Sequence, residues 1–197
     1  MPLSRRYFVS SLLSSAFVCS GGQVGRTQEL FPINMKERRD LDYKFQSREM
    51  AYETAEPAGT IVVDPHRCFL YHVLGGGRAW RYGVSVGKSA KAWTGEAVIK
   101  KMAEWPTWTP APYHLENKPE LAKYLPGGMP GGPDNPLGAR ALYLYIGEVD
   151  TINRIHGAAK PVDIGKKHTA GCIGMLNADV AHLYANVQLG TRVLMLA

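Results

Sequence analysis

The sequence predicts a mainly β domain with one helix near its C-terminal end. Short runs of β-branched, aliphatic and aromatic residues are separated by glycine-rich turns, a pattern typical of strands. The 13 prolines and 21 glycines follow no repeat, which excludes collagen, coiled coil and low-complexity disorder. Apolar residues recur at helical spacing only after Asn177. A chain of 197 residues has room for one such domain and a short appendage.

The first predicted elements are a strand and a hairpin. Residues 60–63 are mostly β-branched and residues 68–74 are apolar and aromatic, so we expect both to be strands. Three glycines at 75–77 supply a turn. Residues 79–86 then form the second strand of the hairpin.

Residues 104–138 are predicted to form a long loop. They hold eight of the 13 prolines, together with Trp105 and Trp108. Proline lacks a backbone donor and restricts φ, so no long helix or strand survives at that density. A loop of this length in a compact domain is usually a lid or a binding surface. Trp108 is therefore a candidate substrate-binding residue.

The last third of the chain returns to regular structure. Residues 141–146 and 152–156 have the composition of strands. Asn177 is predicted to be the N-cap of a helix that runs to residue 190. Its apolar side chains recur on one helical face: Val180, Leu183, Tyr184 and Val187. Residues 191–196 close the chain as a strand.

The N-terminal end is predicted to be an export signal over residues 1–25. Two arginines at positions 5 and 6 precede a mildly apolar run, residues 7–18, and then small residues. This run is too short to span a bilayer, which needs about 20 residues. Residues 4–9 resemble a twin-arginine export motif, and an ordinary Sec signal is the alternative. We expect a periplasmic protein with no stable membrane insertion after signal removal, in which a charged arm, residues 26–57, precedes a domain at 58–197.

Composition excludes several classes of protein and site. Three cysteines are too few for a disulfide-stapled miniprotein or a zinc site of four thiolates. The net charge of +6 suits an anionic partner, but it is too small to indicate nucleic-acid binding. His66, Cys68 and His72 would share one side of a strand, yet no closed set of ligands follows, so we expect no metal.

A histidine and a cysteine in the last third form the candidate reactive pair. Cys172 follows His156 by 16 residues, and each stands beside a glycine. Thiolate is the nucleophilic form of cysteine, and a nearby imidazole can take its proton. Glycine before the cysteine allows a sharp turn in which backbone N–H groups face a developing oxyanion. On spacing alone, a buried cysteine and a hydrogen-bonded histidine would be the favoured interpretation, because such pairs occur by chance.

The same stretch strongly resembles the catalytic domain of the L,D-transpeptidases, the YkuD-type domain. The signature of that family is His-Gly, a linker, and then Ser/Thr-x-Gly-Cys-Ile/Val-Arg. His156-Gly157 and residues 169–174 match it except at the last position. The resemblance spans residues 58–197. It includes separated blocks in the family's order: residues 59–64, 82–87, 105–108, 135–143, 154–157 and 177–193.

The resemblance implies a fold of packed, curved mixed β-sheets with one or two helices and a long loop, rich in proline, glycine and tryptophan, over the cleft. It implies that Cys172 is the nucleophile and that His156 is the general base and then the general acid. The backbone N–H groups of Gly171 and Cys172 would form the oxyanion hole, and the Gly157 carbonyl would orient the imidazole. Thr169 fills the Ser/Thr position and would brace the loop by hydrogen bonding.

The implied activity is cross-linking of peptidoglycan, which would serve cell-wall organisation and cell shape, with no metal or organic cofactor. Cys172 would attack a donor stem peptide between a diamino acid and a D-residue, and the acyl group would pass to an amine of an acceptor stem. Water as the acceptor would make the enzyme an L,D-carboxypeptidase or endopeptidase. A catalytically degenerate wall-binding module is a third interpretation. A carbapenem should acylate Cys172 only in a competent site.

Two positions depart from the family pattern. Gly174 stands where the family has arginine, and Ala170 stands where many members have histidine or serine. Both lie in the predicted substrate-binding region, so donor choice is in question: the usual 3→3 cross-link, or a variant such as 1→3. Arg140 and Tyr143 are further candidate substrate-binding residues. The charge missing at position 174 has four candidate replacements: Arg140, Arg154, Lys166 and Lys167.

Overall fold

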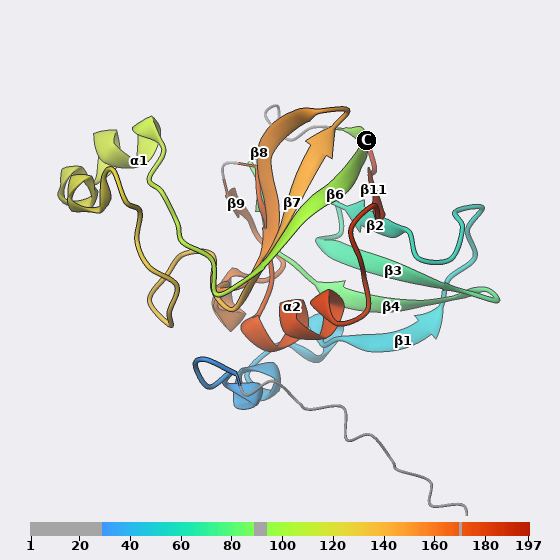
Figure 1. The fold of residues 1–197 in the computed structure, drawn as a ribbon. Helices are drawn as coiled ribbons and strands as arrows, with labels where there is room; N and C mark the ends of the chain where they lie inside the picture. Colours follow the sequence, from blue (N-terminus) through green and yellow to red (C-terminus); the bar gives the residue numbers. More distant parts are fainter. Residues whose placement is uncertain (1–28, 89–93, 170) are drawn as a thin grey trace, which may run out of the picture.

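The computed structural model describes residues 29–88, 94–169 and 171–197, which form a nine-stranded mixed sheet and a two-stranded sheet (Figure 1). The strands of the large sheet are, in the order in which they pair, β1 (Arg48–Ala51), β4 (Arg78–Gly83), β3 (Phe69–Gly75), β2 (Ile61–Asp64), β11 (Arg192–Met195), β6 (Gly95–Glu104), β7 (Arg140–Ile146), β8 (Val149–His156) and β10 (Ile173–Gly174). The small sheet pairs β5 (Val86–Gly87) with β9 (Lys167–Thr169) in parallel. The helical elements are α1 (Pro112–Asn117), α2 (Asn177–Tyr184) and the short 3-10 helices η1 (Met35–Arg39), η2 (Tyr43–Phe45), η3 (Pro119–Tyr124) and η4 (Pro161–Asp163).

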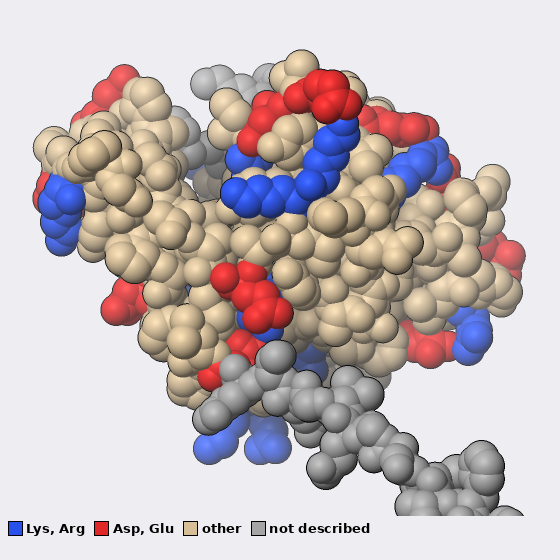
Figure 2. Space-filling view, viewed as in Figure 1, with Lys and Arg blue, Asp and Glu red and all other residues tan. Residues whose placement is uncertain are grey.

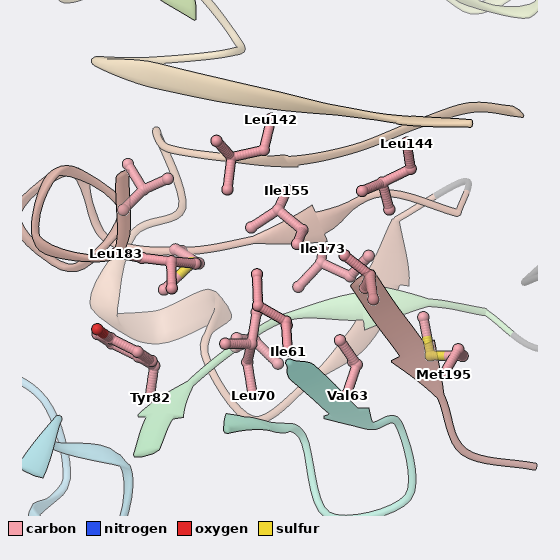
Figure 3. Packing of buried hydrophobic residues seen from close by; sticks show 14 of the residues in the cluster. Ile61, Val63, Leu70, Tyr82, Leu142, Leu144, Ile155, Ile173, Leu183 and Met195 are labelled. Atoms are coloured by element: carbon pink, nitrogen blue, oxygen red, sulfur yellow. The ribbon is translucent and has the colours of Figure 1, made fainter. Parts of the chain in front are cut away.

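The large sheet curves so that its two halves enclose one hydrophobic core. One half contributes Ile61 and Leu70, and the other contributes Leu142 and Ile155, to a single cluster of buried side chains (Figure 3). Leu183 of α2 joins the same cluster. Burial of this apolar surface is the main favourable contribution to folding. The fold is therefore mainly β, as the sequence predicts, and its sheet is mixed and curved, as the family resemblance implies.

The predicted hairpin is confirmed, although its second strand is shorter than expected. Strands β3 and β4 pair antiparallel. Gly75 at the end of β3 and the two glycines of the turn have φ values of +83°, +60° and +69°, a region that glycine enters freely. The second strand ends at Gly83, because the chain then leaves the hairpin. Ser85 bridges to Gly174 and Val86 begins β5 in the small sheet.

Strand β6 is not predicted by the sequence pattern, although it has ten residues. Ala97 and Ile99 are buried at alternate positions, as in a strand with one face on the core, but the adjacent Lys100 and Lys101 are both exposed and break the alternation. The pairing of β6 with β7 shifts register between Ile99 and Lys101. Such a β-bulge turns both lysines away from the core, so the period of two fails there.

Helix α2 differs from its prediction at both ends. Leu176 occupies the N-cap position in place of Asn177, and the helix stops at Tyr184. The Asn177 side chain does not cap the helix, since its oxygen accepts hydrogen bonds from the backbone of two distant loops. Val187 lies beyond the helix but still packs against the core.

The segment before the domain is part of the sheet. Residues 48–51, predicted to belong to a surface arm, form the edge strand β1 against β4. Leu41 is buried, and Arg38 forms an ion pair with the fully buried Asp179 of α2. The prediction of a surface arm is therefore wrong for these residues. Their charged composition suggested exposure to solvent, and their contacts with distant segments cannot be recognised from composition. The predicted signal, residues 1–25, lies outside the described residues.

Residues 104–138 hold only short helical elements, α1 and η3, between β6 and β7. This agrees with the expected effect of dense proline. In Figure 1 the part of this segment that carries α1 projects away from the sheet beside β6, β7 and β8. Lys and Arg are interspersed with Asp and Glu over the face shown in Figure 2. Among the described helices, none is long and apolar enough to cross a membrane.

Candidate active site

The end of β8 and the start of β10 bring the candidate histidine and cysteine onto neighbouring strands. The two strands pair in parallel, with Gly174 opposite His156 and Ile173 opposite Ile155. Cys172 directly precedes β10, so it lies beside the preceding part of β8. Its Sγ is 4.0 Å from the Ile152 carbonyl oxygen and accepts a hydrogen bond from the Arg154 backbone. The sheet register, rather than the loop alone, therefore sets the separation of the pair.

The tautomer of His156 follows from its hydrogen bond. The Gly157 carbonyl oxygen lies 2.8 Å from His156 Nδ1, and a carbonyl can only accept, so Nδ1 carries the hydrogen. In the neutral ring Nε2 is then the free base. Burial lowers the pKa of His156 to about 4, although the bond to Gly157 opposes that change. His156 is therefore a neutral imidazole at pH 7 with Nε2 able to accept a proton.

The Cys172 thiol is also neutral at pH 7. Burial raises the pKa of Cys172, and the hydrogen bond and positive charge of Arg154 oppose this without cancelling it. A thiol with a raised pKa and an imidazole with a lowered pKa do not form a stable ion pair. If these two groups act together, the thiol proton would pass to the imidazole only during attack on a substrate.

The rate at which iodoacetamide alkylates Cys172 should increase with pH up to and beyond pH 9. Only the thiolate reacts, and its population rises with pH when the thiol pKa is raised. Peptide mass spectrometry can follow Cys172 separately from Cys68, which is buried. A rate that is already at its plateau at pH 6 would show a preformed thiolate–imidazolium pair and contradict this prediction.

Thr169 braces the loop that carries the cysteine. Its hydroxyl donates to the Cys172 carbonyl over 2.6 Å, and the Gly171 N–H makes a long contact of 3.4 Å to the same hydroxyl. Gly171 has a φ of +145°. A Cβ on Gly87 would lie 2.9 Å from the Gly171 Cα, so the loop packs tightly on β5. Ala170 lies outside the described residues, and the oxyanion hole stays a prediction.

Asn177 holds the turn that follows His156. Its Oδ1 accepts hydrogen bonds from the backbone N–H groups of Ala139, at 2.8 Å, and Ala158, at 3.0 Å. A Cβ on Gly157 would collide with this oxygen, which explains the glycine after the histidine. Asn177 is thus a positioning residue that sequence reasoning treated as a helix cap. No local pattern could reveal this, since both partners lie 19 or more residues away.

Replacing Asn177 by alanine should lower the free energy of unfolding by about 2 kcal/mol, because two backbone N–H groups lose their partner. It should also lower turnover about tenfold, since the Gly157 carbonyl that orients His156 is no longer held. Denaturant unfolding and kinetics measure the two effects. Asn186→Ala is the matched control, because Asn186 only bonds the His182 carbonyl at the exposed end of α2. Equal effects of the two substitutions would contradict the assigned role.

A cleft of about 310 Å³ opens beside Cys172. One wall comes from the projecting segment, including Trp108, and the other from β6, β7 and β8. Among the residues predicted to bind substrate or to supply the missing charge, those that line this cleft are Trp108, Tyr143 and Arg154. The long segment therefore flanks the cleft, as expected of a loop that contributes to a binding site.

Three other cations and Gly174 lie away from this cleft. Arg140 is buried and forms an ion pair with Glu29 and a hydrogen bond with its own neighbour, the Ala139 carbonyl. Lys166 and Lys167 are exposed near β9. Gly174 exchanges backbone hydrogen bonds with Ser85, and a Cβ there would collide with the Ser85 hydroxyl. We therefore place neither Arg140 nor Gly174 in the binding cleft.

Lys101 lines the cleft and is not among the residues singled out from the sequence. The sequence did contain one signal for Lys101. The Lys100-Lys101 pair interrupts an alternation of apolar and polar residues, and such an interruption indicates a β-bulge. Within the described ranges, no three His, Cys, Asp or Glu side chains cluster to hold a metal ion.

The fold is a curved mixed β-sheet with Cys172 just before β10, the neutral His156 at the end of β8, and a cleft beside Cys172, and it can be compared with the L,D-transpeptidase catalytic domains. The sequence model of that family, YkuD, matches residues 58–195. The chain belongs to the L,D-transpeptidase catalytic domain family.

Similar proteins carry corresponding names. The protein named "Probable L,D-transpeptidase ErfK/SrfK" of Escherichia coli K12 is 37% identical over 48% of this chain, and "Probable L,D-transpeptidase YbiS" of the same strain is 38% identical over 51%. The matches span only 29% and 31% of those two proteins. A crystal structure from Brucella melitensis, named "Probable carnitine operon oxidoreductase caia", is 43% identical with a TM-score of 0.54, over 80% of this chain and 96% of that one. That name belongs to the Brucella protein, and the family of the present chain rests on the YkuD match.

Proposed function

We propose that this protein is a peptidoglycan L,D-transpeptidase in which Cys172 is the nucleophile and His156 is the general base. The observation that carries the proposal is the hydrogen bond from His156 Nδ1 to the Gly157 carbonyl. It leaves Nε2 as the basic nitrogen on the strand next to Cys172. Membership of the YkuD family supplies the reaction class.

The proposed reaction has two acyl transfers. In the first, Cys172 Sγ attacks the carbonyl of the diamino acid in a donor stem while the thiol proton passes to His156 Nε2. Collapse of the tetrahedral intermediate breaks the C–N bond, and the departing D-residue amine takes that proton. In the second, an amine of an acceptor stem attacks the thioester and gives up a proton through His156. The C–S bond then breaks, and the Cys172 thiol forms again.

The N–H groups of Gly171 and Cys172 serve in this proposal as the oxyanion hole. Gly171 adopts a positive φ, and the loop is held by Thr169 and by close packing on Gly87. The long contact from the Gly171 N–H to the Thr169 hydroxyl is weak by hydrogen-bond geometry. A developing oxyanion would therefore compete with it readily.

Two alternatives use the same site differently. Transfer of the acyl group to water would give an L,D-carboxypeptidase or endopeptidase, and a wall-binding module would show no turnover. The retained Cys172 and the neutral, correctly hydrogen-bonded His156 favour a competent site over a degenerate one. The cross-link type, 3→3 or a variant such as 1→3, follows from which carbonyl of the stem the cleft presents to Cys172.

Export to the periplasm completes the proposal. Its support is the predicted signal over residues 1–25, with its two adjacent arginines, and the location of peptidoglycan outside the cytoplasm. Stem peptides are the proposed donor and acceptor.

The test is product analysis with disaccharide-tetrapeptide fragments of peptidoglycan. Purified protein lacking residues 1–25 is incubated with the fragments, and mass spectrometry identifies the products. Dimers would support transpeptidation, and fragmentation would show which stem positions are joined. Shortened monomers alone would favour the carboxypeptidase. No product, together with no mass increase on Cys172 after incubation with a carbapenem, would overturn both enzyme interpretations.

A further inference from the structure

Three residues form a row across adjacent strands of the sheet and end beside Cys172. Lys101 on β6 pairs with Tyr143 on β7, and Tyr143 pairs with Arg154 on β8. The Arg154 backbone in turn bonds the Cys172 sulfur. All four residues line the same cleft. The row therefore extends across strands β6, β7 and β8 to Cys172 within one cleft.

The aromatic ring of Tyr143 holds two cations. The Lys101 ammonium lies 4.6 Å from the ring centroid and the Arg154 guanidinium lies 4.3 Å from it. Both distances are within the range of a cation–π contact. Tyr143 thus gathers two positive side chains into a cleft that a peptide would enter to reach Cys172.

Two irregularities in the sheet create this row. The register shift between Ile99 and Lys101 turns Lys101 away from the core. A second shift lies between β7 and β8, where Tyr143 pairs with Arg154 but Tyr145 pairs with Asp150. Ile152, inside that second irregularity, has a φ of +64°, which is a strained conformation for a β-branched residue. Bulges commonly redirect side chains next to active sites.

The two cations differ in how far their charge is already neutralised. Arg154 is fixed by a two-pronged ion pair with Asp150, at 2.7 and 2.9 Å. Burial acts to raise the pKa of Asp150, but the hydrogen bonds from Arg154 and the Ile152 backbone outweigh it and hold that pKa below its usual value. Within the part of the chain that the structure describes, no acidic side chain forms an ion pair with Lys101. Lys101 therefore supplies the net positive charge of the row, and Arg154 supplies directed N–H donors.

We propose that Lys101 and Arg154, held on Tyr143, form the subsite that binds a carboxylate of the stem peptide next to the bond that Cys172 attacks. This inference rests on the proposed function. The subsite supplies the positive charge that the missing family arginine leaves open at Gly174, where a Cβ would meet the Ser85 hydroxyl. Two carboxylates of a stem tetrapeptide are close enough to that bond: the terminal one of the departing D-residue and, for some stems, the side-chain one of the diamino acid.

The test measures peptide binding in the full-length chain that carries Cys172→Ala, so that the peptide stays intact. Three tetrapeptide stems are compared by calorimetry: the free acid, the C-terminal carboxamide, and the peptide with a carboxamide on the diamino acid. Lys101→Met should raise the Kd of the free acid about tenfold, the loss expected for one charge-assisted contact. The peptide that lacks the recognised carboxylate should bind more weakly to the parent protein, and Lys101→Met should leave its Kd unchanged. The carboxamide that behaves in this way identifies which carboxylate is bound.

Lys100→Met is the matched control. Lys100 is the neighbouring lysine on β6, but it pairs with Glu148 and does not line the cleft, so its substitution should leave all three Kd values unchanged. Lys101→Arg should retain the preference for the free acid, because it keeps the charge. Equal effects of Lys101→Met and Lys100→Met, or equal weakening of acids and amides, would overturn the subsite.

Different experimental results would overturn the proposed subsite and the proposed function. Cross-linking of acid and amide donors at equal rates, with and without Lys101, would leave the transpeptidase standing and overturn the subsite. Absence of any product from the wild-type protein would overturn the transpeptidase. A preference of the Cys172→Ala protein for the acid, lost on Lys101→Met, would still establish the subsite.

Discussion

Replacing Cys172 by alanine should abolish acyl transfer, with a loss of at least about 10⁴-fold in turnover, because no other group of the site can form the thioester. The free energy of unfolding should change by less than about 1 kcal/mol, since the half-buried sulfur makes a weak contact to the Ile152 carbonyl and accepts one weak hydrogen bond from the Arg154 backbone. Product formation from tetrapeptide fragments measures the first effect and denaturant unfolding measures the second.

The matched control for this prediction is Cys68→Ala. Cys68 is the other cysteine within the described residues, it is buried at the end of the β2–β3 turn, and it does not line the cleft. This variant should retain turnover even if its stability falls. Substantial turnover by the Cys172→Ala protein would remove Cys172 from the chemistry, whatever the stability of either variant.

Replacing His156 by glutamine should lower turnover about 10³-fold, the typical contribution of a positioned general base. The loss is expected because the Cys172 thiol and the His156 imidazole are both neutral before the reaction. With its pKa raised by burial, the Cys172 thiol gains nucleophilicity only when a base takes its proton, and glutamine cannot do so. His66→Gln is the control, because His66 is exposed and bonds the Ala197 carbonyl. Comparable activity of the two variants would contradict a base at position 156.

The His156→Gln substitution should also change how the free energy of unfolding depends on pH. The pKa of His156 is about 4 in the fold and its ordinary value is 6.5, so the unfolded chain binds a proton between those two values and the folded chain does not. Wild-type stability therefore falls as pH falls from about 6.5 to about 4, by about 3 kcal/mol from this group. The His156→Gln protein should lack this component when the two unfolding curves are compared across the window. Parallel pH dependences would show that His156 is not buried as a neutral ring.

Most strands of this domain could be predicted because their signals are local. The β-branched and apolar runs that became β2, β3 and β7 are readable within a few residues. Cys172 and His156 were candidates because they resemble a family motif, and their roles stay predictions. Strand β1 could not be recognised, because its residues are only half-buried or exposed and their order comes from pairing with β4.

The parts of the site that escaped prediction depend on contacts between distant segments. Asn177 acts on Ala139 and Ala158 through one oxygen atom, and its position at the start of a helix suggested a cap instead. Arg140 was a candidate for substrate binding because of its charge, yet Glu29 takes up that charge, at a distance of 111 residues along the chain. Charge is visible in a sequence, but the partner that neutralises it is not.

The sequence by itself determined the mainly β class, the late helix and the proline-rich segment, because each of these depends on residues that are close together in the chain. Its resemblance to a family motif made Cys172 and His156 the candidate pair. Only the tertiary structure decided which cations share the cleft with Cys172. Two register shifts, one beside Lys101 and one beside Arg154, bring both side chains onto the ring of Tyr143. A shift of register changes which face of a sheet a residue occupies, and it is set by the pairing of strands that lie far apart in the chain.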